Sequence, residues 1–304
     1  MSKINVGGQA VIEGVMIRSP NYYAVSVRNE QGKIITKTGK IKKKYPIFEK
    51  FFIRGIVNLI EMLVLGIKTL IWSANQQSDK KEEKLSSSEV FWTLALSILF
   101  SIVFFIALPY FLTHLIGFVE ETRPILFNVI DSIIKILLLT LYLFLISLMK
   151  DVQRIFEYHG AEHRSVFCYE HSMVLNLKNS KKFTTYHPRC GTSFIFIVFL
   201  FSIVIFSLLP YLVINTFPGF MNLSFFERKA ILFPLRIAVI PIIAGVSYEI
   251  LKLSAKFNNN ILIRMIVLPG ILLQRITTRL PDPEQTEVAI VALKKVLALE
   301  KNEA

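Results

Sequence analysis

Long apolar stretches separated by polar segments dominate this sequence. Four of these stretches are long enough to cross a bilayer as a helix, which takes about 20 largely apolar residues. They cover residues 90–115, 125–149, 193–217 and 230–251. The pattern therefore predicts an α-helical membrane protein with four transmembrane helices, the first two within 90–149 and the last two within 193–251.

Segment 47–74 is also apolar, but polar residues interrupt it at helical spacing. These are Arg54, Asn58, Glu61 and Lys68, which fall on one face of a helix. An amphipathic helix with such a stripe is typical of the membrane interface, or packs its stripe against other protein. We therefore expect an amphipathic interfacial helix over 47–74, followed by a polar linker over 75–89.

The first 46 residues have the pattern of an extended region. Residues 22–28 and 33–38 read as two strands around the turn-forming 29–32, which predicts a β-hairpin. Before them, 6–18 carries Gly7, Gly8 and Gly14, which permit tight turns or close approach of backbone.

The last segment, 252–304, contains an apolar patch at 261–273 that is too short to cross a bilayer. It predicts a surface or re-entrant segment. Residues 284–301 then predict a helix whose apolar side docks on the cytosolic part. The predicted fold is therefore four transmembrane helices with a small cytosolic α+β region, built from the N-terminal hairpin, segment 150–192 and the tail helix.

Composition supports the membrane interpretation. The chain has 304 residues, of which 53% are hydrophobic and 19% charged, and its mean hydropathy is +0.52. Such values are too apolar for an ordinary soluble domain. The net charge of +13 suits anionic membrane lipid as a partner, because the lysines flank apolar spans and no nucleic-acid-binding motif occurs.

The distribution of Lys and Arg predicts the orientation. Fifteen lie in 1–89, seven in 150–192 and eight in 252–304, whereas the two loops 116–124 and 218–229 hold only three. The positive-inside rule therefore places both termini and 150–192 in the cytosol. Because that compartment is reducing, the two cysteines, Cys168 and Cys190, do not indicate a disulfide framework.

Segment 150–192 carries the candidate chemistry. Residues 159–163 read HGAEH, which fits the inverted zinc-protease pattern H-x-x-E-H. In a helix, His159 and His163 lie four residues apart on one face and can bind one divalent metal ion, with zinc favoured. Glu162 points elsewhere and is the candidate catalytic base beside that ion.

Downstream residues offer further ligands. Glu170 lies two helical turns after His163 and would complete a site of two histidines and one carboxylate. His187 and Cys190 would instead complete a closed four-ligand set, which is structural because no position stays open for substrate. In a third interpretation, His159 and His163 are polar residues at a membrane-proximal helix end and bind nothing. The motif leaves all three open.

Four stretches of the chain resemble the YqhQ-like family of bacterial membrane proteins. They are 7–16 with Arg18, 157–163 (EYHGAEH), 187–192 (HPRCGT), and Gln285 with Glu287, Val288 and Ala289. The sequence departs from the family's pattern at none of these positions. The family is of unknown function and labelled a predicted metal-dependent enzyme, so the resemblance implies a metal-dependent activity at the bacterial cytoplasmic (inner) membrane.

Three residues of these signatures are candidates to hydrogen-bond the metal ligands. Glu13, in a glycine-bounded turn, would reach the site as a ligand or as the partner of a histidine N–H. The alternative is a turn residue in solvent. Glu157 and Arg189 are candidates for the same supporting role.

We weigh three functions. The first is a metal-dependent, zinc-preferring hydrolase at the cytosolic membrane face, acting on a peptide or lipid-linked substrate. The second is a non-catalytic membrane scaffold or assembly factor with a structural Cys/His metal site. The third is a transporter that uses Asp131, Arg236 and Glu249 within the spans. For Asp131 and Lys135, four residues apart, the spacing predicts a mutual ion pair.

Overall fold

Four strands open the chain and form one sheet. The computed structural model describes residues 3–41, 46–50, 53–77, 86–256 and 260–303. Strands β1 (Gly7–Val11), β2 (Gly14–Arg18), β3 (Tyr22–Arg28) and β4 (Ile34–Lys40) pair antiparallel in the order β1-β2-β3-β4. The predicted hairpin is confirmed as β3–β4. The glycine-containing stretch before it adds a second hairpin that the sequence pattern did not predict.

Helices cover both faces of this sheet, because side chains alternate between the faces of a strand. Val15, Ile17 and Ala24 pack on one face against α5 (Lys150–Glu170) and α10 (Pro283–Glu303). Val11, Met16, Val25 and Val27 pack on the other face against Met62, Leu65 and Trp72 of α1 (Ile53–Ala74). The predicted tail helix is thus α10, and it lies within the core of the sheet region.

The remaining helices are mostly apolar. They are α2 (Ser87–Ile102), the π-helical turn Val103–Ala107, α3 (Leu108–Leu115), α4 (Pro124–Ile146), α7 (Gly191–Thr216), α8 (Phe225–Lys256) and α9 (Ile261–Thr277), with short turns at Pro46–Glu49, Leu177–Ser180 (α6) and Phe220–Asn222. Much of the predicted linker 75–89 lies outside the described residues.

In the described part of the chain, five helical stretches are long and apolar enough to cross a membrane. They are Ile53–Ala74, Ser87–Leu115, Pro124–Ile146, Gly191–Thr216 and Phe225–Leu253. Four of them match the predicted spans. The predicted count of four differs from this count of five because α1 meets the same criteria of length and apolarity despite its polar stripe. These helices are consistent with a multi-pass membrane protein.

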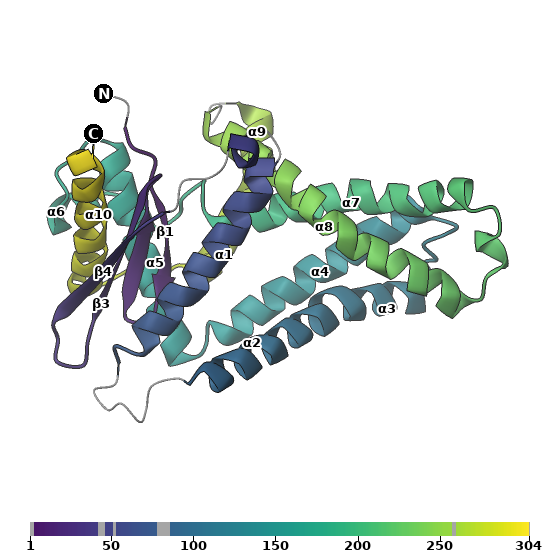
Figure 1. The fold of residues 1–304 in the computed structure, drawn as a ribbon, viewed down its shortest axis with the longest axis horizontal. Coiled ribbons are helices and arrows are strands. Elements are labelled where there is room, and N and C mark those ends of the chain that lie inside the picture. Colours follow the sequence, from purple (N-terminus) through teal and green to yellow (C-terminus); the bar gives the residue numbers. More distant parts are fainter. Residues whose placement is uncertain (1–2, 42–45, 51–52, 78–85, 257–259, 304) are drawn as a thin grey trace.

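Helix α1 lies between the sheet and the apolar helices and contacts both. In Figure 1 it runs steeply across the direction followed by α2, α4, α7 and α8, between these helices and the sheet. Three residues of its polar stripe contact protein, which is one of the two predicted arrangements. The contacts are Arg54 Nη2 to Glu249 Oε2 at 2.5 Å, Asn58 Nδ2 to Tyr248 Oη at 2.8 Å, and Arg18 Nη2 to Glu61 Oε2 at 2.7 Å. Ile60 and Leu63 are exposed on the opposite side.

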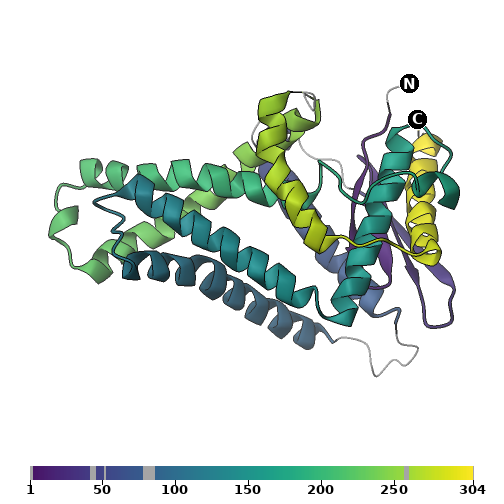
Figure 2. The same ribbon diagram turned by 180° about the vertical axis from the view of Figure 1, so that it is seen from behind.

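The two ends of the molecule differ in character. The sheet, α5, α6 and α10 form one end, which also holds both termini, and α2, α3, α4, α7 and α8 extend from it as an elongated bundle (Figure 1). Large apolar side chains such as Leu96, Leu137 and Leu212 are exposed along the bundle. The view from behind in Figure 2 shows the chain passing from α9 across α5 to α10. This crossing positions the candidate site.

Candidate metal centre

Helix α5 contains many polar residues, but one stretch of it from Tyr158 to Cys168 is mostly buried, because the helix lies between the sheet and the chain that follows α9. Tyr158, Ala161, Glu162 and His163 of α5 are buried. His159 and His163 lie one turn apart, and their ring centroids are separated by 4.4 Å. The predicted placement of both imidazoles on one helix face is therefore present.

A third donor comes from the start of α7. Cys190 is the N-cap residue of this helix, and its Sγ lies 3.4 Å from Nε2 of His159. One ligand atom from each of His159, His163 and Cys190 can be chosen such that all three lie within 4.8 Å of one another. These three residues therefore form a candidate metal centre, although 27 positions separate His163 from Cys190 in the chain.

Backbone carbonyls orient both rings. Nδ1 of His159 lies 2.8 Å from the carbonyl oxygen of Thr277, and Nδ1 of His163 lies 2.5 Å from that of Thr185. A carbonyl oxygen only accepts a hydrogen bond, so each Nδ1 carries the proton and each Nε2 keeps a free lone pair. Metal-binding histidines commonly have this arrangement.

His187 and Glu170 pair with each other beside the three donors. His187 Nε2 lies 3.2 Å from Glu170 Oε2, and its Nδ1 accepts the backbone N–H of Arg189 at 3.2 Å. The guanidinium of Arg189 also contacts the Glu170 carboxylate. The His187 ring centroid is 5.5 Å from that of His163. Of the five predicted ligands, the structure thus gathers three and places the other two as an adjacent pair.

Gln274 of α9, which the sequence pattern did not single out, positions this pair. Its Oε1 accepts the backbone N–H of His187 at 2.6 Å and its Nε2 donates to the His187 carbonyl at 2.8 Å. The side chain is fully buried. In the sequence, Gln274 could have been recognised as an amide side chain in a largely apolar stretch, because a buried amide needs a hydrogen-bond partner.

Glu162 lies in the cavity with the three donors. Burial raises the pKa of its carboxyl to about 8, opposed in part by His159 and by the backbone N–H of Gly8 in β1. Its Oε2 is buried and has no hydrogen-bond partner among the described residues. A buried carboxyl with an unpartnered oxygen beside two imidazoles and a thiol is a donor set that fits a cation.

The protonation states of the donors also fit a metal ion. Burial lowers the pKa of His163, which keeps its ring neutral. Burial acts to raise the pKa of the Cys190 thiol, but the effects of the nearby His163 ring and of Thr192 outweigh it, so this pKa is lowered. Neutral imidazoles and a thiolate are the forms that bind metals. Burial lowers the pKa of the neighbouring His187 to about 4.

A cavity of about 560 Å³ connects these groups. Its polar wall contains His159, Glu162, His163, His187, Arg189 and Cys190, and residues 6–10 around β1 also line it. Leu59 of α1, Phe156 of α5, Phe194 of α7 and Leu251 of α8 contribute apolar wall. The cavity thus lies where the sheet region meets the apolar helices.

Two predicted supporting residues have other partners. Glu13, at the β1–β2 turn with a left-handed φ of 53°, binds the guanidinium of Arg154 and the hydroxyl of Tyr158. Glu157 Oε2 accepts a hydrogen bond from Gln285 Nε2 at 2.7 Å. Neither carboxylate lines the cavity; both connect α5 to neighbouring elements. Arg189 does line it.

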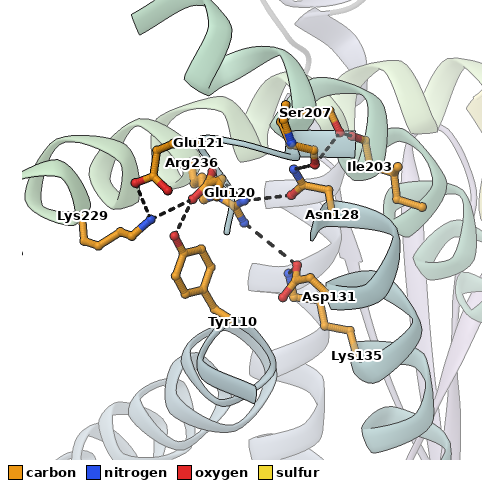
Figure 3. Close-up of polar contacts among 11 residues, drawn as sticks. Tyr110, Glu120, Glu121, Asn128, Asp131, Lys135, Ile203, Ser207, Lys229 and Arg236 are labelled. Carbon is orange, nitrogen blue, oxygen red and sulfur yellow. Dashed lines mark hydrogen bonds and ion pairs between the residues drawn. The ribbon is translucent and has the colours of Figure 1, made fainter. Parts of the chain in front are cut away.

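A second polar cluster lies inside the helical bundle, among residues of α3, α4, α8 and the segment before α4 (Figure 3). The predicted ion pair of Asp131 and Lys135 is present, with Nζ 2.5 Å from Oδ2. Arg236 Nη2 lies 2.8 Å from both Glu120 Oε1 and Asn128 Oδ1. All five side chains are buried. The cluster ties α4 and the segment before it to α8, and none of its residues lines the cavity at the histidines.

Comparison with known proteins agrees with the resemblance seen in the sequence. The model of a family described as a protein of unknown function, DUF1385, matches residues 51–299. The uncharacterized protein YqhQ of Bacillus subtilis (strain 168) is 34% identical over 316 residues, covering 97% of this chain and 92% of the relative. No solved structure matches. The chain therefore belongs to the YqhQ-like DUF1385 family of proteins of unknown function.

Proposed function

We propose that this protein is a metal-dependent hydrolase whose active site lies at the cytosolic face of a membrane. One observation carries the proposal: His159, His163 and Cys190 place ligand atoms within 4.8 Å of one another, and the buried carboxyl of Glu162 lines the same cavity. A base beside a three-donor centre is the arrangement of metal-dependent hydrolases.

The residues present favour zinc and a catalytic centre. Two imidazole nitrogens and one thiolate sulfur are donors that zinc accepts well. Structural zinc sites use four protein ligands, whereas catalytic sites use three and leave room for the substrate. His187 and Glu170 bind each other, which favours the three-donor arrangement of His159, His163 and Cys190. A bound zinc ion would supply Lewis acidity, which lowers the pKa of water and polarises an acyl or phosphoryl oxygen.

Glu162 is the proton carrier in this proposal. Its side chain is 5% exposed, and it lines the same cavity as His159 and Cys190. A nearby cation favours the carboxylate form, so Glu162 would accept a proton from the attacking water and return it to the leaving group. Arg189, paired with Glu170 at the cavity wall, would orient a substrate oxygen.

The proposed location follows from charge and from the apolar helices. The sheet region, both termini and 150–192 would lie in the cytosol of a bacterium, because Lys and Arg concentrate in those segments. The stretches Ser87–Leu115, Pro124–Ile146, Gly191–Thr216 and Phe225–Leu253 would cross the inner membrane. Helix α1 would lie at the interface with Ile60 and Leu63 toward lipid, because its polar face contacts protein.

Metal analysis tests the proposal. Detergent-purified protein is expected to carry about one zinc ion per chain, as its three donors form one site. His159→Ala and Cys190→Ser should remove the metal. Glu162→Gln should keep the metal and the fold but lose hydrolysis of ester and peptide reporters. Wild-type protein that folds but binds no zinc, even when zinc is supplied, contradicts the proposal.

The same variants distinguish the scaffold alternative from the hydrolase. A structural Cys/His site predicts that Glu162→Gln preserves every function of the protein in the cell, whereas His159→Ala unfolds the region around α5. The three-donor centre favours the hydrolase. The transporter alternative predicts that neutralising Asp131, Arg236 or Glu249 impairs function more than removing the histidines. The ion pairs of these three residues favour a structural role.

A further inference from the structure

We infer that the substrate of the proposed hydrolase is a polypeptide, bound in extended form along the free edge of β1. The inference rests on the proposed function and adds the class of substrate. It rests on three features. Some backbone N–H and C=O groups of β1 point away from the sheet, these groups face the cavity of the metal centre, and the cavity wall combines hydrogen-bonding groups with apolar side chains.

Strand β1 is an edge strand, since the order of the sheet is β1-β2-β3-β4. Two residues connect β1 to β2, and Val11 faces Gly14 at the hairpin end. In such a hairpin the facing residues at the end form a hydrogen-bonded pair, and bonded and non-bonded pairs then alternate. Gln9 and Gly7 therefore bond to β2, while Gly8 and Ala10 direct their N–H and C=O groups outward.

The position of Gly8 supports this alternation, because Oε1 of Glu162 on α5 lies 3.1 Å from where a β-carbon of Gly8 would be, and the backbone N–H of Gly8 acts on the Glu162 carboxyl. Within the described residues, the outward N–H and C=O groups of Ala10 have no backbone partner. An edge strand with unpaired backbone groups is a template for another extended chain. The structure thus presents such a template directly beside the proposed proton carrier.

This edge faces the cavity of the metal centre. Gly7, Gly8, Gln9 and Ala10 line the same space of about 560 Å³ as the three donors and Glu162. A β-carbon on Gly8 would lie 2.3 Å from the carbonyl oxygen of Met16 and 3.1 Å from Oε1 of Glu162. Glycine at this position therefore lets the strand lie close to the carboxyl, and a chain paired with β1 would place its own carbonyl groups beside the centre.

The cavity wall favours a peptide over a lipid chain. An acyl chain along β1 would bury the outward N–H and C=O groups without partners, which is unfavourable, whereas a peptide backbone bonds to them. The cavity wall also includes Leu59, Phe156 and Leu251, which suits apolar side chains of the peptide. A second cavity of about 640 Å³ shares Val6, Gly7, Asn58, Met62 and Tyr248 with the first and extends the groove.

The reaction is then hydrolysis of a peptide bond. The oxygen of a water molecule bonds to the carbonyl carbon and the C–N bond breaks. Glu162 takes one proton from that water and transfers it to the leaving nitrogen, so the products are a carboxylic acid and an amine. Water is the co-reactant.

Cleavage of a random decapeptide library by the zinc-loaded full chain, followed by mass spectrometry, tests the inference. Ala10→Pro removes the outward N–H and leaves the bonds to β2 intact, since proline is tolerated in edge strands. We expect it to lower cleavage at least tenfold at unchanged zinc content and melting temperature. Thr38→Pro, which places the same ring on an exposed residue of the opposite edge strand β4, should leave cleavage unchanged.

A measurement on the wild-type protein tests the inference even if the proline variant misfolds. Library peptides with alternate backbone nitrogens methylated cannot pair with β1 and should resist cleavage. Equal cleavage of methylated and unmethylated peptides overturns the inference, as does zinc-loaded protein that leaves the library intact. Hydrolysis of phosphatidylglycerol vesicles in place of peptides would retain the proposed hydrolase and replace its substrate class. Failure to bind zinc would instead remove the proposed function itself.

Discussion

A β-carbon added to Gly160 would lie 2.0 Å from the carbonyl oxygen of Arg279. The chain between α9 and α10 crosses α5 at this glycine, and the N–H of Arg279 donates to the carbonyl of Phe156 at 2.9 Å. Glycine costs a helix about 1 kcal/mol relative to alanine. Its presence between His159 and Glu162 is therefore explained by close contact of two backbones. Thr277, the last residue of α9 before the crossing, supplies the carbonyl that orients His159.

Gly160→Ala should consequently destabilise the protein, although alanine is the better helix former. The methyl group must displace the backbone at Arg279, and overpacking of this kind costs about 1–3 kcal/mol. We expect a lower melting temperature and reduced zinc content. Gly191→Ala is the matched control, because nothing lies within 4 Å of a β-carbon there. Equal melting temperatures of the two variants would contradict the close contact.

Gln274→Leu should destabilise the region around His187. Leucine leaves the N–H and C=O of His187 buried without the partners they have at 2.6 and 2.8 Å. Each unsatisfied group costs about 1–3 kcal/mol. Chemical denaturation should show the loss. The control is Gln76→Leu, just after the end of α1, where Nε2 donates to the carbonyl of Trp72; it should change the denaturation midpoint little.

The buried cluster of Figure 3 predicts a large effect for Arg236→Met. The variant leaves Glu120, which is fully buried, without the guanidinium at 2.8 Å. Removing one partner of a buried pair costs about 3–5 kcal/mol. Thermal unfolding in detergent should detect it, and adding Glu120→Gln should recover part of the loss. Arg18→Gln, which breaks a partly exposed pair, should cost no more than about 1 kcal/mol.

Stability of the metal-free protein should depend on pH through Glu162. Burial raises the pKa of its folded-state carboxyl from 4.5 to about 8, so the folded state binds more protons than the unfolded state between these values. Stability therefore falls as pH rises through this window, by at most roughly 1.4 kcal/mol per pH unit. Denaturation midpoints in EDTA at pH 5, 6.5 and 8.5 measure this fall in stability. The wild type should lose stability relative to Glu162→Gln as pH rises; a constant difference would contradict the raised pKa.

The sequence by itself determined the features that depend on local periodicity. Apolar stretches of sufficient length set four of the helices, and the spacing of four residues put His159 and His163 on one face of α5. Turn chemistry at 29–32 set the β3–β4 hairpin. The sequence pattern did not predict strands β1 and β2, because their glycines obscure the alternation of apolar and polar residues that is typical of a strand.

Only the tertiary structure decided which donors meet. Five residues were candidate ligands, and the packing of α9 on the start of α7 selects among them, with Gly270 lying against Ser193 and Gln274 holding His187. These contacts join residues dozens of positions apart, and their free energy comes from burial of whole helix faces. Local spacing carries no information on such contacts, so Cys190 joins the histidines while Glu170 pairs with His187.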